Sequence, residues 1–285
     1  MKIGVCFLTY NSEDCIAHSV SCAKAALAGL AGEIVVVDNA SRDGSVAGVS
    51  QAHPDVRIIP NGRNVGYAAG NNVGARYLLE RGCDMLTFVN PDAFLKPDTL
   101  AKMAAALSET PGAGCVGAVM DHGEGPSARC FRNRPGFLEL LVVDGLTRYL
   151  PIARRLIVGL LRRLIERRYA PLDRAASVQE VYAVAGPCIM FPAAVFRAIG
   201  GFDEGTFLFM EELIVSERLR RIGQKVIGAP QAEFGHPQGG SAGRYRWRSA
   251  YQYIRSERHA VGKYFGWPAW KTNLLTGLHG AELVP

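Results

Sequence analysis

Short apolar runs alternate with helical stretches through the first part of the chain, and this alternation limits the fold more than any other feature. The apolar runs cover residues 3–8, 33–37, 56–59 and 85–90, with a further one at 114–120. Helical stretches lie between them at about 13–30, 45–52 and 100–107, and another opens in the glycine-rich segment 61–74 and runs to residue 81. Strands that alternate with helices in this way form parallel, doubly wound sheets, so we predict an α/β fold.

The strand at 85–90 ends at Asn90-Pro91, because proline has no amide donor and cannot continue a central strand. Asp92 therefore lies just past the carboxyl end of a strand, where open α/β sheets bind ligands. A carboxylate there is well placed to hold a hard divalent cation and, through it, a diphosphate. On its own, Asp92 is better explained as a residue of a strand-ending turn.

Polar loops follow the first two predicted strands as well. Asn11 comes after the first strand, and Asp38 and Asn39 come directly after the second. Crossover connections bring such loops to one edge of the sheet, together with the glycine-rich segment 61–74. We expect a nucleotide at this edge. The 61–74 segment has neither a GxGxxG motif nor a Walker lysine, and its glycines are also explained by turn geometry.

Composition narrows the class of protein. The 285 residues are 48% hydrophobic and 20% charged, and the net charge of +6 favours anionic partners such as nucleotides or phospholipid head groups. The seven cysteines show no CxxC pair, so we expect a reducing, cytoplasmic compartment. We expect no signal peptide and no membrane span. Nucleic-acid binding rests on the charge alone, so none is expected.

Two later segments are basic and amphipathic, at 146–168 and 244–265. In the first, leucines and isoleucines share one side at helical spacing and arginines share the other. Such helices suit the surface of an anionic membrane, and they equally suit packing on their own domain with a solvated basic face. Both interpretations stay open, so peripheral attachment at the inner face of the membrane is one expectation.

The remaining pattern predicts strands at 181–191 and 225–227 and helices at 193–199 and 211–223. Gly186 lies in a break of the first strand that allows a ligand to approach the backbone. Glu211 and Glu212 open a helix, where the helix dipole favours carboxylates, and one of them can act as a base near a sugar hydroxyl. His236 lies in a glycine-rich loop at 233–241 and is either structural or a metal ligand.

These pieces occur in an order that resembles the inverting glycosyltransferases of family 2, with the GT-A fold, and within them the rhamnosyltransferase-like branch. The resemblance covers about residues 3–245. It is carried by Leu8-Thr-Tyr-Asn-Ser12, Val36-Val-Asp-Asn-Ala-Ser-Arg-Asp-Gly-Ser45, Asn64-Val-Gly-Tyr-Ala-Ala-Gly-Asn71, Phe88-Val-Asn-Pro-Asp92, Ala185-Gly-Pro187, Gly201-Phe-Asp-Glu204, Glu211-Glu212 with Arg218 and Gly223, and His236 with Ser241.

The resemblance implies a doubly wound mixed sheet with helices on both faces and additional C-terminal helices. It implies a domain over 1–243, with a basic helical insertion at about 125–177, and a helical extension over 244–285. Asp92 and His236 would bind Mg²⁺ or Mn²⁺, and the base would be Glu212, with Glu211 second. The nucleotide sugar would meet Thr9, Asn11, Asp38, Asn39, Arg63, Asn64, Asn90 and Gly186.

Three positions depart from the family pattern. Asn90 replaces the first acid of the Asp-x-Asp motif, Glu212 stands where aspartate is more usual, and Ile214 stands where the branch usually has aspartate. The last departure motivates an alternative hypothesis, a non-catalytic nucleotide-sugar-binding protein. A nucleotidyltransferase would need a basic glycine-rich loop near the N-terminus, and residues 9–12 are not one.

The leading hypothesis is a metal-dependent, inverting glycosyltransferase that moves a sugar, with L-rhamnose from dTDP-rhamnose as one candidate, to a saccharide or lipid-linked hydroxyl. The cation would offset the charge of the departing diphosphate, and a carboxylate would take the proton of the acceptor. The sequence does not indicate the oligomeric state.

Overall fold

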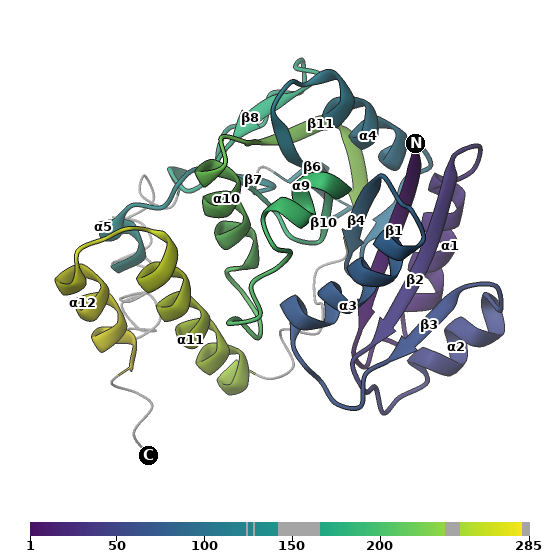
Figure 1. Ribbon diagram of the computed structural model, residues 1–285, viewed down its shortest axis with the longest axis horizontal. Coiled ribbons are helices and arrows are strands. Elements are labelled where there is room, and N and C mark those ends of the chain that lie inside the picture. The colour runs from purple at the N-terminus through teal and green to yellow at the C-terminus, as the bar shows by residue number, and fades with distance from the viewer. Residues whose placement is uncertain (124, 128, 142–165, 237–245, 281–285) are drawn as a thin grey trace.

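The computed structural model describes residues 1–123, 125–127, 129–141, 166–236 and 246–280. Within these ranges the centre of the molecule is a nine-stranded sheet of order β3-β2-β1-β4-β10-β6-β11-β5, with β8 paired to β11 (Figure 1). Its strands are β1 (Lys2–Thr9), β2 (Ala31–Asp38), β3 (Arg57–Pro60), β4 (Met85–Val89), β5 (Phe94–Leu95), β6 (Ala113–Asp121), β8 (Gln179–Val181), β10 (Cys188–Pro192) and β11 (Lys225–Gly235).

Helices cover both faces of the sheet. The described helices are α1 (Ile16–Ala26), α2 (Ser45–Ala52), α3 (Tyr67–Glu80), α4 (Thr99–Glu109), α5 (Phe137–Glu139), α9 (Ala193–Ala198), α10 (Glu211–Arg221), α11 (Arg246–Tyr264) and α12 (Ala269–Gly280). Apolar residues of α1, α2 and α4 join one core cluster, and those of α3, α9 and α10 join a second. This division follows from strand geometry: alternate residues of β1 enter opposite clusters, with Val5 in the first and Cys6 in the second.

The sheet is mixed, as the resemblance implied, and the purely parallel sheet expected from the strand–helix alternation is wrong. The strands β3, β2, β1 and β4 are parallel, but β10 lies antiparallel between β4 and β6. The short strands β5 and β8 are also antiparallel to β11. An antiparallel strand needs no crossover helix, so alternation of strands and helices does not reveal it.

Several predicted boundaries also change. The helix expected at 13–30 is shorter, because α1 spans Ile16–Ala26. The strand expected at 225–227 continues to Gly235, so part of the predicted loop 233–241 is strand. The strand expected at 181–191 is divided into the end of β8, β9 (Ala183–Val184) and β10; β9 pairs with β7 (Phe131–Arg132).

A helical layer extends the molecule beyond the sheet. In Figure 1, α11, α12 and α5 lie together on the side away from α1 and α2, with α10 between them and the sheet. A third apolar cluster holds this layer, with Leu213 and Ile214 of α10 buried together with Val261 of α11 and Leu275 of α12. Most of the predicted helix 146–168 lies outside the described residues. No described helix is both long enough and apolar enough to cross a bilayer.

Candidate functional site

Three strand ends form one edge of the sheet, as expected for the site. Thr9 at the end of β1 pairs with Asp38 at the end of β2, and Phe7 of β1 pairs with Val89 at the end of β4. Because these strands are parallel, the segments that follow them emerge side by side. The polar residues after β1, β2 and β4 therefore share one edge.

The segment after β2 is organised by side-chain amides. Asn39 donates from Nδ2 to Asn64 Oδ1 at 3.2 Å and to the Gly66 carbonyl at 3.2 Å. Its Oδ1 accepts from Asn61 Nδ2 at 2.9 Å. Asn39 is buried, so it acts as the junction between the β2 end and the glycine-rich segment before α3. The Asp38 carboxylate accepts the Ser41 backbone N–H at 3.1 Å, which fixes the turn.

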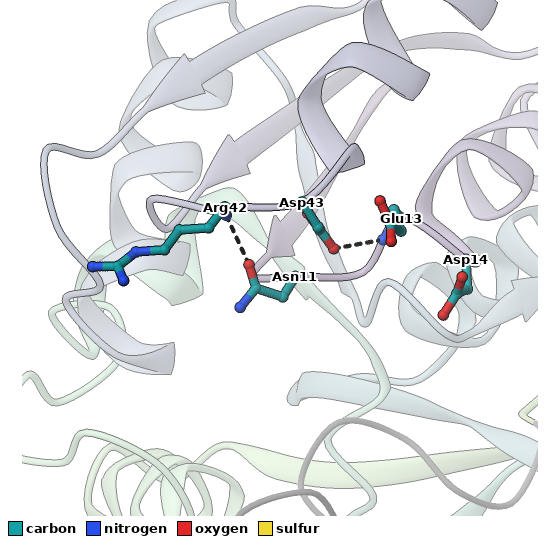
Figure 2. A pocket seen from close by; sticks show the side chains of 5 residues that line it. All are labelled: Asn11, Glu13, Asp14, Arg42 and Asp43. Carbon is teal, nitrogen blue, oxygen red and sulfur yellow. Dashed lines mark hydrogen bonds between the residues drawn. The ribbon is translucent and has the colours of Figure 1, made fainter.

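A pocket of about 230 Å³ opens beside this edge, lined by Asn11, Glu13, Asp14, Arg42 and Asp43 (Figure 2). Asn11 has a left-handed backbone with φ of 53°, which asparagine adopts more readily than most residues. Its Oδ1 accepts the Arg42 backbone N–H at 2.8 Å, and Asp43 accepts the Glu13 N–H at 3.1 Å. These two hydrogen bonds join the loop after β1 to the loop after β2, and the polar pocket lies between the two loops.

Asp92 and His236 are brought together by the pairing of β5 and β11. Gly235 lies opposite Phe94 in that antiparallel pair, so the residues just outside it also meet. Asp92 Oδ1 and His236 Nε2 are 3.3 Å apart, and both side chains are mostly buried. Burial alone would raise the pKa of Asp92, but the hydrogen bond and charge of His236 lower it below its ordinary value. The carboxylate is therefore ionised at neutral pH.

This pair fits a divalent cation as part of its ligand shell. A carboxylate is a ligand for Mg²⁺ and Mn²⁺, and imidazole adds preference for a transition metal. In the described residues, no three side chains of His, Cys, Asp or Glu gather where they could hold a metal ion. Ligands from a diphosphate and from water would have to complete the shell, as is usual for metals that bind with a nucleotide.

Glu211 and Glu212 begin α10 after a strained turn. Phe209 and Met210 have φ of 74° and 71°, in the left-handed region that bulky residues rarely adopt. The two carboxylates that follow this turn have different surroundings. Glu211 is 6% exposed, and its Oε1 has no hydrogen-bond partner in the described part of the chain. Burial, reinforced by the charge of Glu212, raises the pKa of Glu211 to about 8.

Glu212 lies in a more polar setting. Its side chain is 19% exposed, and its Oε1 is 3.6 Å from Nη1 of Arg132 in β7. Arg132 is held in place by the pairing of β7 with β9, and its Nε is buried without a hydrogen-bond partner among the described residues. The two glutamates thus divide into a neutral acid and a carboxylate beside a guanidinium.

A chain of contacts links the two halves of the candidate site. Asn90 donates its backbone N–H to the Pro187 carbonyl at 2.9 Å. The preceding carbonyl, of Gly186, accepts from Tyr67 Oη at 3.3 Å. Tyr67 also donates its backbone N–H to the carbonyl of Phe207, four residues before Glu211, at 2.7 Å. Burial and the charges of Glu211 and Glu212 raise the pKa of the Tyr67 phenol well above its ordinary value. Asn90 and Asp92 are thus joined through Gly186 and Tyr67 to the start of α10.

Two of the residues predicted to meet a nucleotide sugar lie differently from the rest. Thr9 is fully buried and its backbone carbonyl accepts the Asn39 N–H at 2.8 Å, so its side chain shapes the loop from inside. Arg63 is exposed. The structure places the other members of the set, Asn11, Asp38, Asn39, Asn64, Asn90 and Gly186, along the edge or at the junction described above.

Sequence reasoning missed Arg132 and Tyr67. Arg132 belongs to a basic segment that was noticed only for its charge, and its place beside Glu212 depends on the pairing of β7 with β9. Tyr67 lies in a quoted motif, Asn64–Asn71, but nothing in its spacing indicates the hydrogen bond to Gly186. Both contacts join segments more than fifty residues apart, which local patterns do not reveal.

The profile of the family described as glycosyl transferase family 2 matches residues 5–191, which is more than half of the chain. The chain belongs to glycosyl transferase family 2. Its fold and the order of its motifs agree with this, so the protein is a glycosyltransferase with a GT-A fold.

Individual relatives agree with the family assignment. An N-acetylglucosaminyl-diphospho-decaprenol L-rhamnosyltransferase of Mycobacterium tuberculosis is 27% identical over 263 residues, covering 87% of this chain and 80% of the relative. Among solved structures, mannosyltransferase PcManGT from Pyrobaculum calidifontis, in complex with GDP-Man and Mn²⁺, has a TM-score of 0.59 at 18% identity and covers 97% of this chain and 68% of its own. S. aureus TarS in complex with UDP-GlcNAc has a TM-score of 0.55 at 14% identity, with 98% and 71% covered.

Proposed function

We propose that this family 2 glycosyltransferase is a metal-dependent, inverting enzyme that transfers a sugar from a nucleotide diphosphate to a hydroxyl of a saccharide or lipid-linked acceptor. The observation that carries the proposal is the chain of hydrogen bonds from Asn90 to Pro187, from Tyr67 to Gly186, and from Tyr67 to Phe207 in the loop before Glu211. It supports a shared site for the Asp92 carboxylate, as a cation ligand, and for a candidate base at the start of α10. L-Rhamnose is the first sugar to test, because the mycobacterial relative is a rhamnosyltransferase.

On the donor side, the residues after β1 and β2 hold the nucleotide. Asn11, Asp38 and Asn39 lie along the edge of the sheet, and Asn64 is tied to Asn39 by a hydrogen bond. Asp92 and His236 would hold Mg²⁺ or Mn²⁺, which when bound offsets the charge of the departing diphosphate. The same pair positions the diphosphate so that the anomeric carbon faces the acceptor.

On the acceptor side, Glu212 accepts the proton of the attacking hydroxyl. It suits this role because its side chain is partly exposed and lies beside the Arg132 guanidinium. Glu211 suits the role less well, because its raised pKa keeps it protonated at neutral pH. A single displacement at the anomeric carbon, with no covalent enzyme intermediate, inverts its configuration.

The structure also bears on the non-catalytic alternative, which Ile214 motivated. Ile214 is fully buried in the cluster that packs α10 against the C-terminal helices. An acid at this position would face that apolar cluster. The isoleucine therefore contributes packing where the branch usually has an acid, and it does not change Glu212. This supports the catalytic proposal over the binding-only one.

The proposal is tested by nucleotide diphosphate release from a panel of nucleotide sugars, dTDP-rhamnose first, with Mn²⁺ or Mg²⁺ and a polyprenyl-diphosphate-linked saccharide. Glu212→Gln should lower turnover by about 10²–10⁴-fold, the usual contribution of a general base. Asp92→Asn should remove the dependence on added metal together with most of the activity. Glu180→Gln, which changes an exposed carboxyl of β8, is the matched control and should keep wild-type turnover.

Wild-type rates in Glu212→Gln would show that the base is assigned wrongly. Nucleotide binding by calorimetry without turnover on any sugar or acceptor would favour the non-catalytic alternative.

A further inference from the structure

The C-terminal helical layer exposes a patch of apolar side chains, Leu138 of α5 with Trp270 and Leu274 of α12. Their side chains are 66%, 60% and 43% exposed. Seven large hydrophobic residues are exposed in the described part of the chain, and three of them gather here. Single exposed apolar residues need no explanation, but a group of them usually marks a binding surface.

Contacts between α5 and α12 hold the patch together. The ring of Phe137, next to Leu138, meets the rings of Trp267 and Trp270 edge-on at 5.6 and 5.8 Å. Leu274 lies one helical turn after Trp270, on the same side of α12. Lys271 Nζ lies 5.3 Å from the Phe137 ring centre and 5.5 Å from that of Trp270. The patch is therefore built on the contacts of Phe137 with Trp270 and Lys271, and Leu138 and Leu274 are exposed on the same two helices.

The surrounding charge indicates what this surface meets. Residues 246–280, which form α11 and α12, contain six lysines and arginines and one acidic residue, Glu257. Glu257 is fully buried and Lys263 is bound to Asp203, while Arg255 and Arg258 are exposed, so positive charge remains at the surface of this layer. Tryptophan and leucine with lysine nearby are typical of segments that lie in the head-group region of an anionic bilayer. Lysine is depleted in protein–protein interfaces, so Lys271 beside Trp270 favours lipid head groups over a protein partner.

We propose that Leu138, Trp270, Lys271 and Leu274 form a docking surface for the head-group region of an anionic lipid bilayer. The surface joins the acceptor side of the candidate site through packed helices. On α11, Ser256 donates from Oγ to the Leu208 carbonyl at 2.8 Å, three residues before Glu211. In Figure 1, α10, α11 and α12 lie in succession outward from the sheet. Presentation of a lipid-linked acceptor to Glu212 rests on the proposed function; the lipid contact does not.

The test is flotation of the full chain with phosphatidylcholine vesicles, with and without phosphatidylglycerol, at low and high salt. The wild type should float with the anionic vesicles and lose binding at high salt. The double variant Leu138→Ser/Leu274→Ser, which removes exposed side chains only, should bind at least about tenfold more weakly. Lys271→Glu should weaken binding to the anionic vesicles alone.

Ile222→Ser is the matched control, because Ile222 is 45% exposed at the end of α10 and lies outside the patch. It should float like the wild type, and all variants should keep the wild-type melting temperature. No flotation of the wild type, or equal flotation of the double variant, would overturn the proposal. A dimer in light scattering that the double variant dissociates would also overturn it, by assigning the surface to a second copy.

The two proposals fail separately. Nucleotide diphosphate release with a water-soluble acceptor does not need the membrane, so the double variant should keep wild-type turnover in that assay. Flotation without any transferase activity would contradict the proposed function but would not contradict the proposed docking surface.

Discussion

Glu211 and Glu212 are neighbours in the sequence, yet they have opposite environments. Glu211 is turned inward, where burial and the adjacent charge raise its pKa to about 8. Glu212 is turned toward Arg132 and solvent. Pairs of carboxyl groups whose surroundings separate their pKa values commonly take different roles in catalysis. We infer that Glu212 reacts, and that Glu211 is held neutral behind it.

The raised pKa of Glu211 has a consequence for stability. An unfolded glutamate has a pKa of about 4.3, so between about pH 4.3 and pH 8 the folded chain keeps a proton that the unfolded chain has released. The free energy of unfolding therefore falls as pH rises through this window and levels off above it. Glu211→Gln, which cannot ionise, should gain melting temperature relative to the wild type from pH 5 to pH 8, with no further gain at pH 9.

Thermal unfolding at unit pH intervals measures this difference. Glu180→Gln accounts for the simple loss of one charge. A Glu211→Gln difference that stays constant with pH would show that the Glu211 carboxyl ionises in the folded protein as it does in the unfolded chain.

The acid pair shows how far residue-level prediction reaches. Its place after an aromatic run was visible in the sequence, and so was the expectation that one member is a base. Which member is buried was not visible, because that depends on the left-handed turn at Phe209 and Met210. Nothing in the identity of a phenylalanine or a methionine indicates such a backbone, since both normally avoid it.

Among the elements, the start of α3 fits closely against the loop that leads to the acid pair. Gly66 precedes α3 with φ of 87°, and a Cβ added there would lie 2.5 Å from the Phe207 carbonyl oxygen. The next residue, Tyr67, donates its backbone N–H to that same carbonyl at 2.7 Å. A side chain at Gly66 would thus push apart α3 and the loop that leads to the acid pair.

Gly66→Ala should destabilise the protein by about 1–3 kcal/mol, from the left-handed backbone and the clash together. It should also lower transferase activity, because Tyr67 would shift from Gly186. Gly48→Ala is the matched control: Gly48 lies inside α2 with open space around its Cα, so alanine there should be neutral or stabilising by about 0.5–1 kcal/mol. Denaturant unfolding measures the stability of both variants. Similar stabilities would show that the backbone and surroundings of Gly66 do not require glycine.

Element prediction succeeded where patterns are local and failed where pairing is distant. The helix 45–52 was predicted with its observed limits, and β1, β2 and β4 within two residues of theirs. The antiparallel direction of β10 and the extension of β11 to Gly235 were missed. Both depend on partners far away in sequence, and β11 gains its last residues from pairing with β5 and β6.

At the scale of the molecule, one carboxylate fastens the helical layer to the rest. Asp203, in the loop before α10, accepts from His259 Nε2 and Lys263 Nζ of α11, each at 3.0 Å, and from the Tyr264 hydroxyl. Arg218 of α10 is 3.3 Å away. Burial alone would raise the pKa of Asp203, but hydrogen bonds from Tyr264 and His259 hold this pKa well below its ordinary value. The part of the chain described at 246–280 is thus bound to the main body through α11.

Asp203→Asn should lower the free energy of unfolding at neutral pH by at least about 1.5–3 kcal/mol, the value of one hydrogen bond to a charged group. The contribution of a carboxylate with a lowered pKa is present above about pH 4 and is lost as pH falls below that value, so the difference from wild type should shrink in acid. Hydrogen exchange should show faster exchange in α11 and α12.

Asp55→Asn is the comparison for that variant, since Asp55 pairs with Lys24 at the surface and its loss should change the free energy of unfolding far less than the loss of Asp203. Equal losses in the two variants would mean that Asp203 is an ordinary surface acid and that the third apolar cluster alone holds the helical layer.

The position of β10 between β4 and β6 also affects how the chain is built. Strands β3, β2, β1 and β4 are neighbours in the sheet, and all of them lie within the first 89 residues. This part of the sheet can therefore assemble early during synthesis. Strand β6 cannot join it until residues 188–192 emerge and pair with both sides. Because closing that gap spans about seventy residues, its insertion should be the slow step of folding, and chains stalled before it would expose an open strand edge to aggregation.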